Sequence, residues 1–425
     1  MQVKIYKGFK SFSKSINVFE KTEVSSTVHE ILTNVRKSGD AALREYTEQF
    51  DKVIPDSWLV PESALEEALD NLEDDLFLVL QQAADNIMLF HERQKSDSQF
   101  NFSSDGSVLG WKVTPVDSAG IYIPGGRAAY PSTLLMNAIP AQIAEVPRIA
   151  LVSPPGPSGL PHPLVMATAA FMGLEELYAV GGAQSIAALA YGTESIEKVI
   201  KITGPGNAYV AEAKRQVYGT VGIDSLAGPS EIMIVCDRQD IPVDYLVRDM
   251  LSQAEHDPDA GAFLVTTSEK QAKKVADSLK KLVPKLPRRE IIEASFKNRS
   301  AIILVDNMDG IFEVVNELAP EHLEVLTKEP FNDLYRIRNA GAIFLGPNTP
   351  EPVGDYFAGP NHTLPTSGCA KFSSPLGVQD FVKTSSVISY SAERLQSQGE
   401  QIIRFAEEEG LFSHAAAIQA RLDNL

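Results

Sequence analysis

The sequence predicts an α/β fold, because short apolar strands alternate with helices along most of the chain. One run of alternation extends from about residue 115 to 235, and a second continues to about residue 345. Connections of this kind favour right-handed crossovers and mostly parallel sheets. The 425 residues suffice for two to four domains, and a hydrophobic content of 44% excludes a disordered chain. We therefore predict two parallel-sheet domains with helical flanking segments.

The first of four predicted regions, residues 1–110, is a helical N-terminal region. The apolar residues between Val28 and Val35 recur at i, i+3, i+4 and i+7, which indicates one buried helix face. Gly39 is expected to end this helix, and Asp40 to begin the next. We expect the helical layer to pack on the second α/β domain.

The first α/β domain is predicted over residues 111–235. Its expected strands are Ile149–Val152, Leu177–Val180, Val199–Ile202 and Ile232–Val235, and its expected helices include Ala183–Ala190 and Asn207–Val217.

The second α/β domain is predicted over residues 236–373, followed by a helical tail over 374–425. The expected strands of this domain are Ala262–Val265, Ala301–Val305 and Ala342–Leu345, and the expected helices are Glu269–Leu279, Met308–Leu318 and one ending near His256. The longest expected helix of the tail is Ala392–Glu409.

Composition excludes several classes of protein. The net charge of −18 argues against a partner that is nucleic acid or an anionic membrane, since both need a basic surface. No apolar run approaches the length of a membrane span, and the basic N-terminus lacks the apolar core of a secretory signal. Two cysteines form no disulfide framework. We expect a cytoplasmic protein.

Glycine-rich turns follow several predicted strands, where open α/β sheets bind ligands at the carboxyl ends of their strands. The turns are Gly125-Gly126, Gly181-Gly182, Gly204-Pro205-Gly206 and Gly228-Pro229. Glycine lets the main chain approach a phosphate closely. The sequence contains neither G-x-G-x-x-G nor a P-loop, so any dinucleotide would have to bind in another way.

Four of the seven histidines have a carboxylate or amide neighbour in the sequence, a combination that suits zinc and similar divalent metals. Gln253 and His256 share a helix face at i, i+3, although the residues alone would favour Glu255 as the ligand. The other three groups are Glu321-His322, Asp355 with His362, and Glu409 with His414. Because none of these candidate ligands is a thiolate, we do not expect a structural zinc site. The metal would instead keep one coordination position open for the substrate.

Seven ordered segments resemble the histidinol dehydrogenase family, from about residue 20 to the C-terminus. They are IYIPGG (121–126), VGGAQSIAALAYG (180–192), ITGPGNAYVAEAKRQV (202–217), LAGPSE (226–231), LSQAEHDPD (251–259), APEHLE (319–324) and GDYFAGPNHTLPT (354–366). The resemblance implies two incomplete Rossmann-like domains, and a homodimer in which the C-terminal tail crosses to the partner subunit.

The resemblance also implies a site, residue by residue. One zinc ion per subunit would be held by Gln253, His256, Asp355 and His414. Glu321 and His322 would be catalytic, and Tyr122, Gln184 and Asn207 would contact NAD. Substrate contacts would be Ser230, Gln253, His256, His322, Asp355, His362, Glu409 and His414.

The implied reaction is the oxidation of L-histidinol to L-histidine through histidinaldehyde, the last step of histidine biosynthesis. His322 is the expected general base, because the ordinary pKa of an imidazole is ~6.5. Cys236 reads as a core residue and Cys369 as a loop residue, so a hydrated aldehyde is expected rather than a thiohemiacetal. Three alternatives are a related zinc alcohol dehydrogenase acting on another small amino or sulfo alcohol, a zinc hydrolase and a non-catalytic binding protein.

Overall fold

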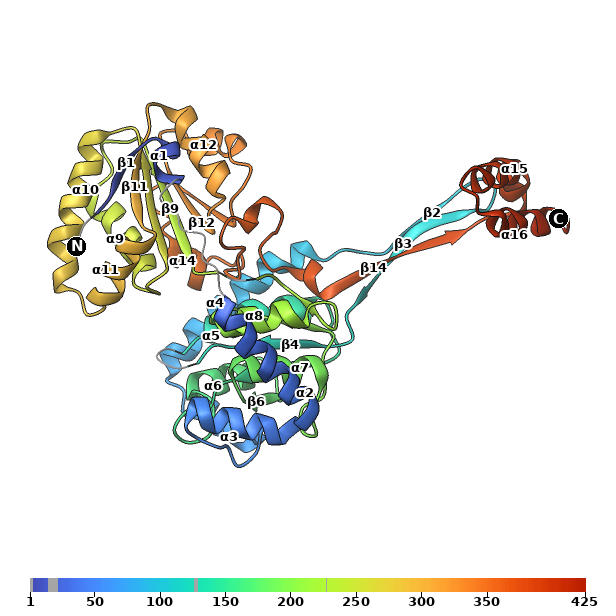
Figure 1. Ribbon diagram of the computed structural model, residues 1–425, viewed down its shortest axis with the longest axis horizontal. Helices are drawn as coiled ribbons and strands as arrows, with labels where there is room; N and C mark the ends of the chain where they lie inside the picture. The colour runs from blue at the N-terminus through green and yellow to red at the C-terminus, as the bar shows by residue number, and fades with distance from the viewer. Residues whose placement is uncertain (1–2, 14–21, 126–128, 227) are drawn as a thin grey trace. The chain divides into compact units, whose positions relative to one another are not determined.

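Among the described residues of the computed structural model (3–13, 22–125, 129–226 and 228–425), the chain forms three β-sheets in two compact units (Figure 1). The first unit comprises the described residues up to Gln94 and Val116–Phe381, and it contains two parallel sheets. The second unit comprises Lys95–Pro115 and Val382–Leu425, and its sheet is antiparallel. The predicted α/β fold class is confirmed.

The five-stranded sheet of the first unit has the order β6-β5-β4-β7-β8, with every pair parallel. Numbered along the chain this order is 3-2-1-4-5, which is five of the six strands of a Rossmann sheet. Its strands are β4 (Ala119–Tyr122), β5 (Ile149–Ser153), β6 (Leu177–Ala179), β7 (Lys201–Thr203) and β8 (Gly222–Ile223), and the helices between them are α5 (Pro131–Ile143), α6 (Pro163–Phe171), α7 (Gly182–Tyr191) and α8 (Ala208–Val217).

The six-stranded sheet repeats this topology, in the order β1-β11-β10-β9-β12-β13. When strands β9 to β13 are numbered along the chain, their order in the sheet is again 3-2-1-4-5. Strand β1, from the N-terminal segment, pairs with β11 and adds a sixth strand at that edge. The strands are β1 (Ile5–Lys7), β9 (Glu231–Cys236), β10 (Gly261–Thr266), β11 (Ala301–Leu304), β12 (His322–Leu326) and β13 (Ala342–Leu345). The helices are α1 (Phe9–Ser13), α9 (Val243–Ala254), α10 (Glu269–Leu282), α11 (Arg289–Asn298), α12 (Met308–Leu318), α13 (Pro330–Asp333) and α14 (Glu351–Tyr356).

Alternation along the strands of the six-stranded sheet separates two cores. Ile232 and Ile234 of β9 pack with α9, α10 and α11, whereas Met233 and Val235 pack with α12 on the other face. A strand covered on both faces reads as a continuous apolar run, as Glu231–Cys236 does after its first residue. Strand β12 departs from this rule, because its buried residues include a histidine and a glutamate.

The N-terminal helices α2 (Thr22–Asp51), α3 (Glu62–Asp70) and α4 (Asp74–His91) pack on the five-stranded sheet and its helices. The apolar face of α2 contacts α7 and α8. Packing on the second α/β domain was therefore a wrong prediction. Periodicity identifies the buried face of a helix, but it carries no information about the surface that covers this face. Helix α2 does break at Gly39, which adopts a φ of 52°.

The change from one parallel sheet to the other lies between β8 and β9, within residues 224–230. The predicted edge between residues 235 and 236 falls instead at the end of β9, a strand of the six-stranded sheet. The sheet to which a strand belongs depends on its pairing partners, which local sequence does not reveal.

In the second unit, β3 (Val108–Pro115) pairs antiparallel with both β2 (Gln99–Phe102) and β14 (Val382–Ser389). Helices α15 (Ala392–Glu408) and α16 (Phe412–Leu422) pack against each other. Strand β14 interrupts the predicted helical tail, and its residues are mostly exposed without apolar alternation. The described part of the chain contains no helix long and apolar enough to cross a membrane.

Candidate active site

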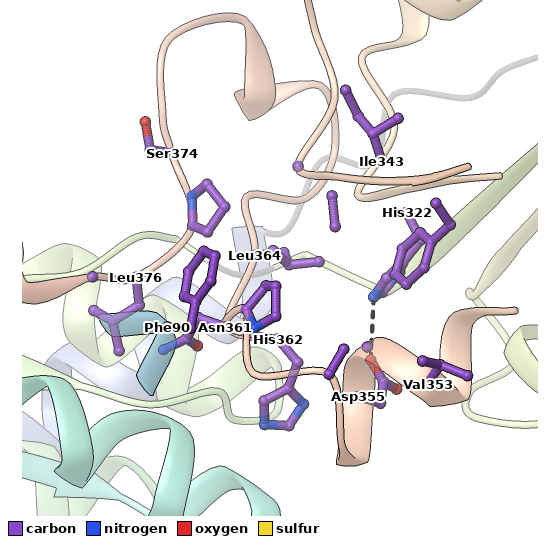
Figure 2. Close-up of a pocket in the computed structure, with 18 of the residues that line it drawn as sticks. Phe90, His322, Ile343, Val353, Asp355, Asn361, His362, Leu364, Ser374 and Leu376 are labelled. Atoms are coloured by element: carbon purple, nitrogen blue, oxygen red, sulfur yellow. Dashed lines mark ion pairs between the residues drawn. The ribbon is translucent and has the colours of Figure 1, made fainter. Parts of the chain in front are cut away.

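A cavity of about 430 Å³ lies at the amino ends of β12 and β13 (Figure 2). Its wall includes His322 at the start of β12, Asp355 of α14, His362 of the following loop and Phe90 of α4. The sequence reasoning placed ligands at the carboxyl ends of strands. The cavity lies instead at the amino edge of the six-stranded sheet.

His322 is buried, with one ring nitrogen bound to the main chain and the other free. Nδ1 lies 3.1 Å from the carbonyl oxygen of Glu231 and donates to it in the neutral tautomer. Within the described chain, Nε2 has no hydrogen-bond partner, and it lies 3.7 Å from Oδ1 of Asp355 (Figure 2). This tautomer leaves Nε2 as the atom that can accept a proton from a molecule in the cavity.

Carboxylates surround this imidazole. Nδ1 of His322 lies 3.7 Å from Oε2 of Glu321 and 3.7 Å from Oε1 of Glu351. Burial disfavours the imidazolium, but the nearby carboxylates outweigh burial and raise the pKa of His322 to about 10. Burial also raises the pKa of Glu321 to about 8 and that of Glu351 to about 7. All three groups of this cluster therefore hold a proton more strongly than they would in water.

The neighbouring strand holds Glu321 in place. Its Oε2 accepts a hydrogen bond of 2.9 Å from the main-chain N–H of Glu231. Glu231 is itself fixed, because its carboxylate accepts from Nη2 of Arg299 at 3.2 Å and from the N–H of Ser367 at 2.6 Å. Pairing of β9 with β12 thus positions both expected catalytic residues through the same strand end.

Three of the four expected zinc ligands lie on two adjoining segments, the end of α9 and α14. These segments meet where Oγ of Ser252 donates to Oε2 of Glu351 at 3.1 Å. Gln253 is 1% exposed, and its Oε1 has no hydrogen-bond partner in the described chain. His256 follows at the solvent-exposed end of α9, within electrostatic range of Asp355. A buried amide oxygen without a donor is a group that a cation would satisfy.

A second set of possible ligands is visible in the geometry. One ligand atom from each of His322, Glu351 and Asp355 lies within 4.8 Å of the others. This set shares only Asp355 with the ligands expected from the sequence. It identifies Glu351 as a site residue that the sequence analysis did not name.

Glu324 and Asp249 are two further acidic residues that the sequence analysis did not name. The Oε1 atom of Glu324 accepts from the N–H of Glu351 at 2.9 Å, and burial together with the charge of Asp249 raises the pKa of Glu324 to about 9. The available signal was the alternation in residues 322–326, where His322 and Glu324 share a face of a fully buried strand.

The expected substrate residues of the first unit lie around the same edge. His362 lines the cavity, its Nε2 has no hydrogen-bond partner in the described chain, and burial lowers its pKa. Ser230 immediately precedes β9, and its carbonyl oxygen accepts from the N–H of Gly261 at 3.0 Å.

The residues expected to contact NAD lie at the carboxyl ends of the five-stranded sheet. Tyr122 ends β4 and its hydroxyl accepts from the N–H of Gly182 at 3.3 Å. Gln184, in the first turn of α7, is buried with an unpartnered Oε1 in the described chain. Asn207 caps α8, with its Oδ1 accepting from the N–H groups of Tyr209 and Val210.

Glu409 and His414 belong to the second unit, where both are exposed at the turn between α15 and α16. The first unit therefore supplies Gln253, His256 and Asp355, but it does not contain the fourth expected zinc ligand.

Comparisons with known proteins agree on one family. A family model described as histidinol dehydrogenase matches residues 15–422. The chain is 51% identical to histidinol dehydrogenase of Bacillus subtilis over 422 residues, 99% of each chain. It is 52% identical to that of Geobacillus kaustophilus over 401 residues, 94% of each. The crystal structure of histidinol dehydrogenase from Elizabethkingia anophelis superposes with a TM-score of 0.94 at 34% identity, covering 99% of this chain and 98% of that one.

Replacing Glu324 by Gln is expected to stabilise the metal-free protein at neutral and alkaline pH. The pKa of Glu324 is about 9 in the folded chain against an ordinary value of 4.5, so the folded state keeps a proton that the unfolded state releases. The contribution of Glu324 to the free energy of unfolding of the wild type therefore falls as the pH rises from 4.5 toward 9. The Gln variant has no ionisable group at this position, so its free energy of unfolding does not fall for this reason. At pH 7 we expect the variant to gain about 1–3 kcal/mol in free energy of unfolding.

Urea unfolding at pH 4, 7 and 9 with a chelator measures this gain. Glu313→Gln, an exposed substitution on α12, serves as the control and should follow the wild type. Parallel pH profiles for Glu324→Gln and the wild type would contradict the expectation.

Proposed function

Because the chain belongs to the histidinol dehydrogenase family, we propose that it catalyses the zinc-dependent, NAD-linked, four-electron oxidation of L-histidinol to L-histidine through histidinaldehyde. The observation that carries this proposal is the buried Glu321–His322 pair, in which His322 lines the cavity and its Nε2 has no hydrogen-bond partner in the described chain. Family membership supports the oxidation of histidinol in histidine biosynthesis, and the site chemistry supports the finer steps below.

The donor set fits a zinc ion. Gln253, His256 and Asp355, with His414, would supply one amide oxygen, two imidazole nitrogens and one carboxylate, and the unpartnered Oε1 of Gln253 accords with such a role. When bound, the metal would orient the neutral nitrogen atoms of the substrate and offset the carboxylate charge around His322, which lowers the pKa of that imidazole toward the range of a general base.

In the alcohol step, Nε2 of His322 takes the hydroxyl proton of histidinol while the carbinol hydride passes to NAD. Nδ1 donates to the carbonyl of Glu231 throughout, so the ring keeps its orientation as it becomes charged. Glu321 and Glu351, each 3.7 Å from Nδ1, then stabilise the imidazolium. The products of this step are the aldehyde, NADH and one proton.

In the aldehyde step, Glu321 takes a proton from water as the water oxygen adds to the carbonyl carbon, and the imidazolium of His322 gives its proton to the carbonyl oxygen, which yields the neutral hydrate and a neutral His322. Its Oε2 is bound to the main chain of Glu231, which leaves Oε1 as the atom for the proton. Burial raises the pKa of Glu321 to about 8, so its carboxylate is a stronger base than an exposed one. The hydrate then transfers its hydride to a second NAD, with His322 accepting the hydroxyl proton.

A thiol pathway is disfavoured by the positions of the cysteines. Cys236 is buried at the carboxyl end of β9, opposite to the edge that carries the cavity. Burial raises the pKa of Cys369, and neither cysteine lines the cavity. An aldehyde hydrate is therefore the intermediate that we propose.

We further propose a homodimer in which Glu409 and His414 of one subunit complete the site of the other. Both residues are exposed within the second unit, and the first unit lacks the fourth zinc ligand. Glu409 would accept a hydrogen bond from the substrate, and His414 would join the metal ligands.

Two NADH per histidinol are expected when the zinc-loaded protein receives L-histidinol and excess NAD, because alcohol and aldehyde are oxidised in turn. Absorbance at 340 nm gives the ratio. A chelator should abolish turnover, and added zinc should restore it. A ratio of one NADH per histidinol would contradict the proposed aldehyde step. If no NADH formed, L-histidinol would not be the substrate, and the substrate would be unidentified.

Glu321→Gln is expected to slow the oxidation of histidinaldehyde about a hundredfold more than that of histidinol, because only the aldehyde step needs water activated by this residue. Single-turnover kinetics with each substrate separate the two steps. Glu255→Gln, beside His256 but exposed, is the control and should match the wild type. Equal losses in both steps would refute this division of labour.

Mixing the inactive variants His322→Ala and His414→Ala is expected to restore activity, because a mixed dimer pairs an intact His322 with a tail from the other subunit. Random exchange of subunits should give about a quarter of the wild-type rate. Differently tagged chains, co-expressed and purified through both tags, provide the pure mixed dimer, which should give about half of the wild-type rate because one of its two sites is intact. An inactive mixed dimer would place His414 in the site of its own subunit.

A further inference from the structure

A buried ion pair lies beneath the loop that precedes α8. Lys214 of α8 is 2% exposed, and its ammonium group pairs with the carboxylate of Asp224, which is 4% exposed. Asp224 follows β8 and continues its pairing beside β7, because its N–H donates to the carbonyl of Ile202 at 3.2 Å. Buried charges of this kind need a specific reason, since their desolvation offsets most of their mutual attraction.

The pair binds both main-chain groups of Gly204. Oδ2 of Asp224 accepts from the N–H of Gly204 at 2.9 Å, and Nζ of Lys214 donates to its carbonyl oxygen at 3.0 Å. Gly204 is the first residue of the loop 204–207, which ends at the capping residue Asn207. The ion pair therefore fixes the direction in which the chain leaves β7.

Gly204 also lies directly against the end of β4. Its φ is +107°, and a Cβ at this position would be 2.2 Å from the carbonyl oxygen of Tyr122. No larger residue fits between the two strand ends. The residue held by the ion pair thus touches the main chain of one expected NAD contact and lies three residues from another, Asn207.

The orientation of Asn207 depends on the same loop. Its Oδ1 accepts from the N–H groups of Tyr209 and Val210, at 3.0 and 3.1 Å. The amide can then offer only its Nδ2 hydrogens to a ligand, and these match acceptors such as a ribose hydroxyl or a phosphate oxygen of NAD. A shift of the loop would move this donor.

We propose that the Lys214–Asp224 ion pair is a positioning device for the loop 204–207, which it holds in the geometry that binds NAD. This inference rests on the proposed use of NAD as the oxidant. Lys214 and Asp224 act through Gly204 and do not touch the reacting atoms. Loss of the pair should weaken NAD binding while histidinol binding at the other sheet is retained.

The test uses the full-length, zinc-loaded enzyme with two variants. Lys214→Met/Asp224→Asn removes both charges together, so that no unpaired charge stays buried, but it deprives the carbonyl of Gly204 of its donor. Asp224→Glu keeps the charge pair and displaces the carboxylate from the N–H of Gly204. The second variant keeps the test decisive if the first does not fold.

The matched control is Arg148→Met/Glu176→Gln. This pair is partly buried, with side chains 22% and 26% exposed, and belongs to the same sheet, but it lies at the amino end of β5, away from the glycine turns. It should lower the melting temperature without altering the KM for NAD. Any general effect of removing an ion pair from this sheet therefore appears in the control.

Steady-state kinetics with each substrate varied, and fluorescence titration with NADH, give the readout. We expect the KM for NAD and the Kd for NADH to rise about tenfold in both variants, as for the loss of one positioned hydrogen bond, with the KM for histidinol within about twofold of wild type. An unchanged KM for NAD in the variant that folds, or an equal rise in both KM values, would overturn this inference alone. A wild type that neither reduces nor binds NAD would overturn the proposed function and this inference together.

Discussion

The burial of charged groups at the amino edge of the six-stranded sheet is the constraint on which the site depends. Each group must find a partner where water is excluded, and paired strands provide main-chain partners in fixed positions. The end of β9 binds the imidazole of His322 through the carbonyl of Glu231 and the carboxylate of Glu321 through its N–H. In the same way, the N–H at the start of α14 binds Glu324. The geometry of the candidate site is thus a consequence of strand pairing.

The two parallel sheets share one strand order but present the residues expected to be functional at opposite edges. In the five-stranded sheet, Tyr122 and the loop at Gly204 lie at the carboxyl ends, where glycine allows close packing of the main chain. In the six-stranded sheet, α9 runs antiparallel to the strands and brings Gln253 back to the amino edge, where β12 begins with His322. A repeated topology therefore does not imply a repeated site.

Residue patterns predicted the parts of the fold and site that depend on local or repeated signals. Strand and helix alternation identified β5, β9, β10 and β13 closely, and the pairing of histidines with acids pointed to His322 and Asp355. Resemblance to a family added the catalytic roles expected of Glu321 and His322. Patterns missed Glu324 and Glu351, because an isolated acid in the sequence does not show that it will be buried beside another. Likewise, β14 has no apolar alternation, and its strand conformation comes from pairing with β3.

Local patterns in the sequence were sufficient to predict the α/β class, the positions of most strands, the glycine turns and the residues available for chemistry. These features follow from the periodicity and residue type of short segments. Three further features became visible only in the folded chain: α2 covers the five-stranded sheet, the cavity lies at an amino edge, and Lys214 and Asp224 bind Gly204. Each of these joins segments that are distant in sequence or come from different elements, and the energy of such contacts depends on geometry that no local pattern encodes.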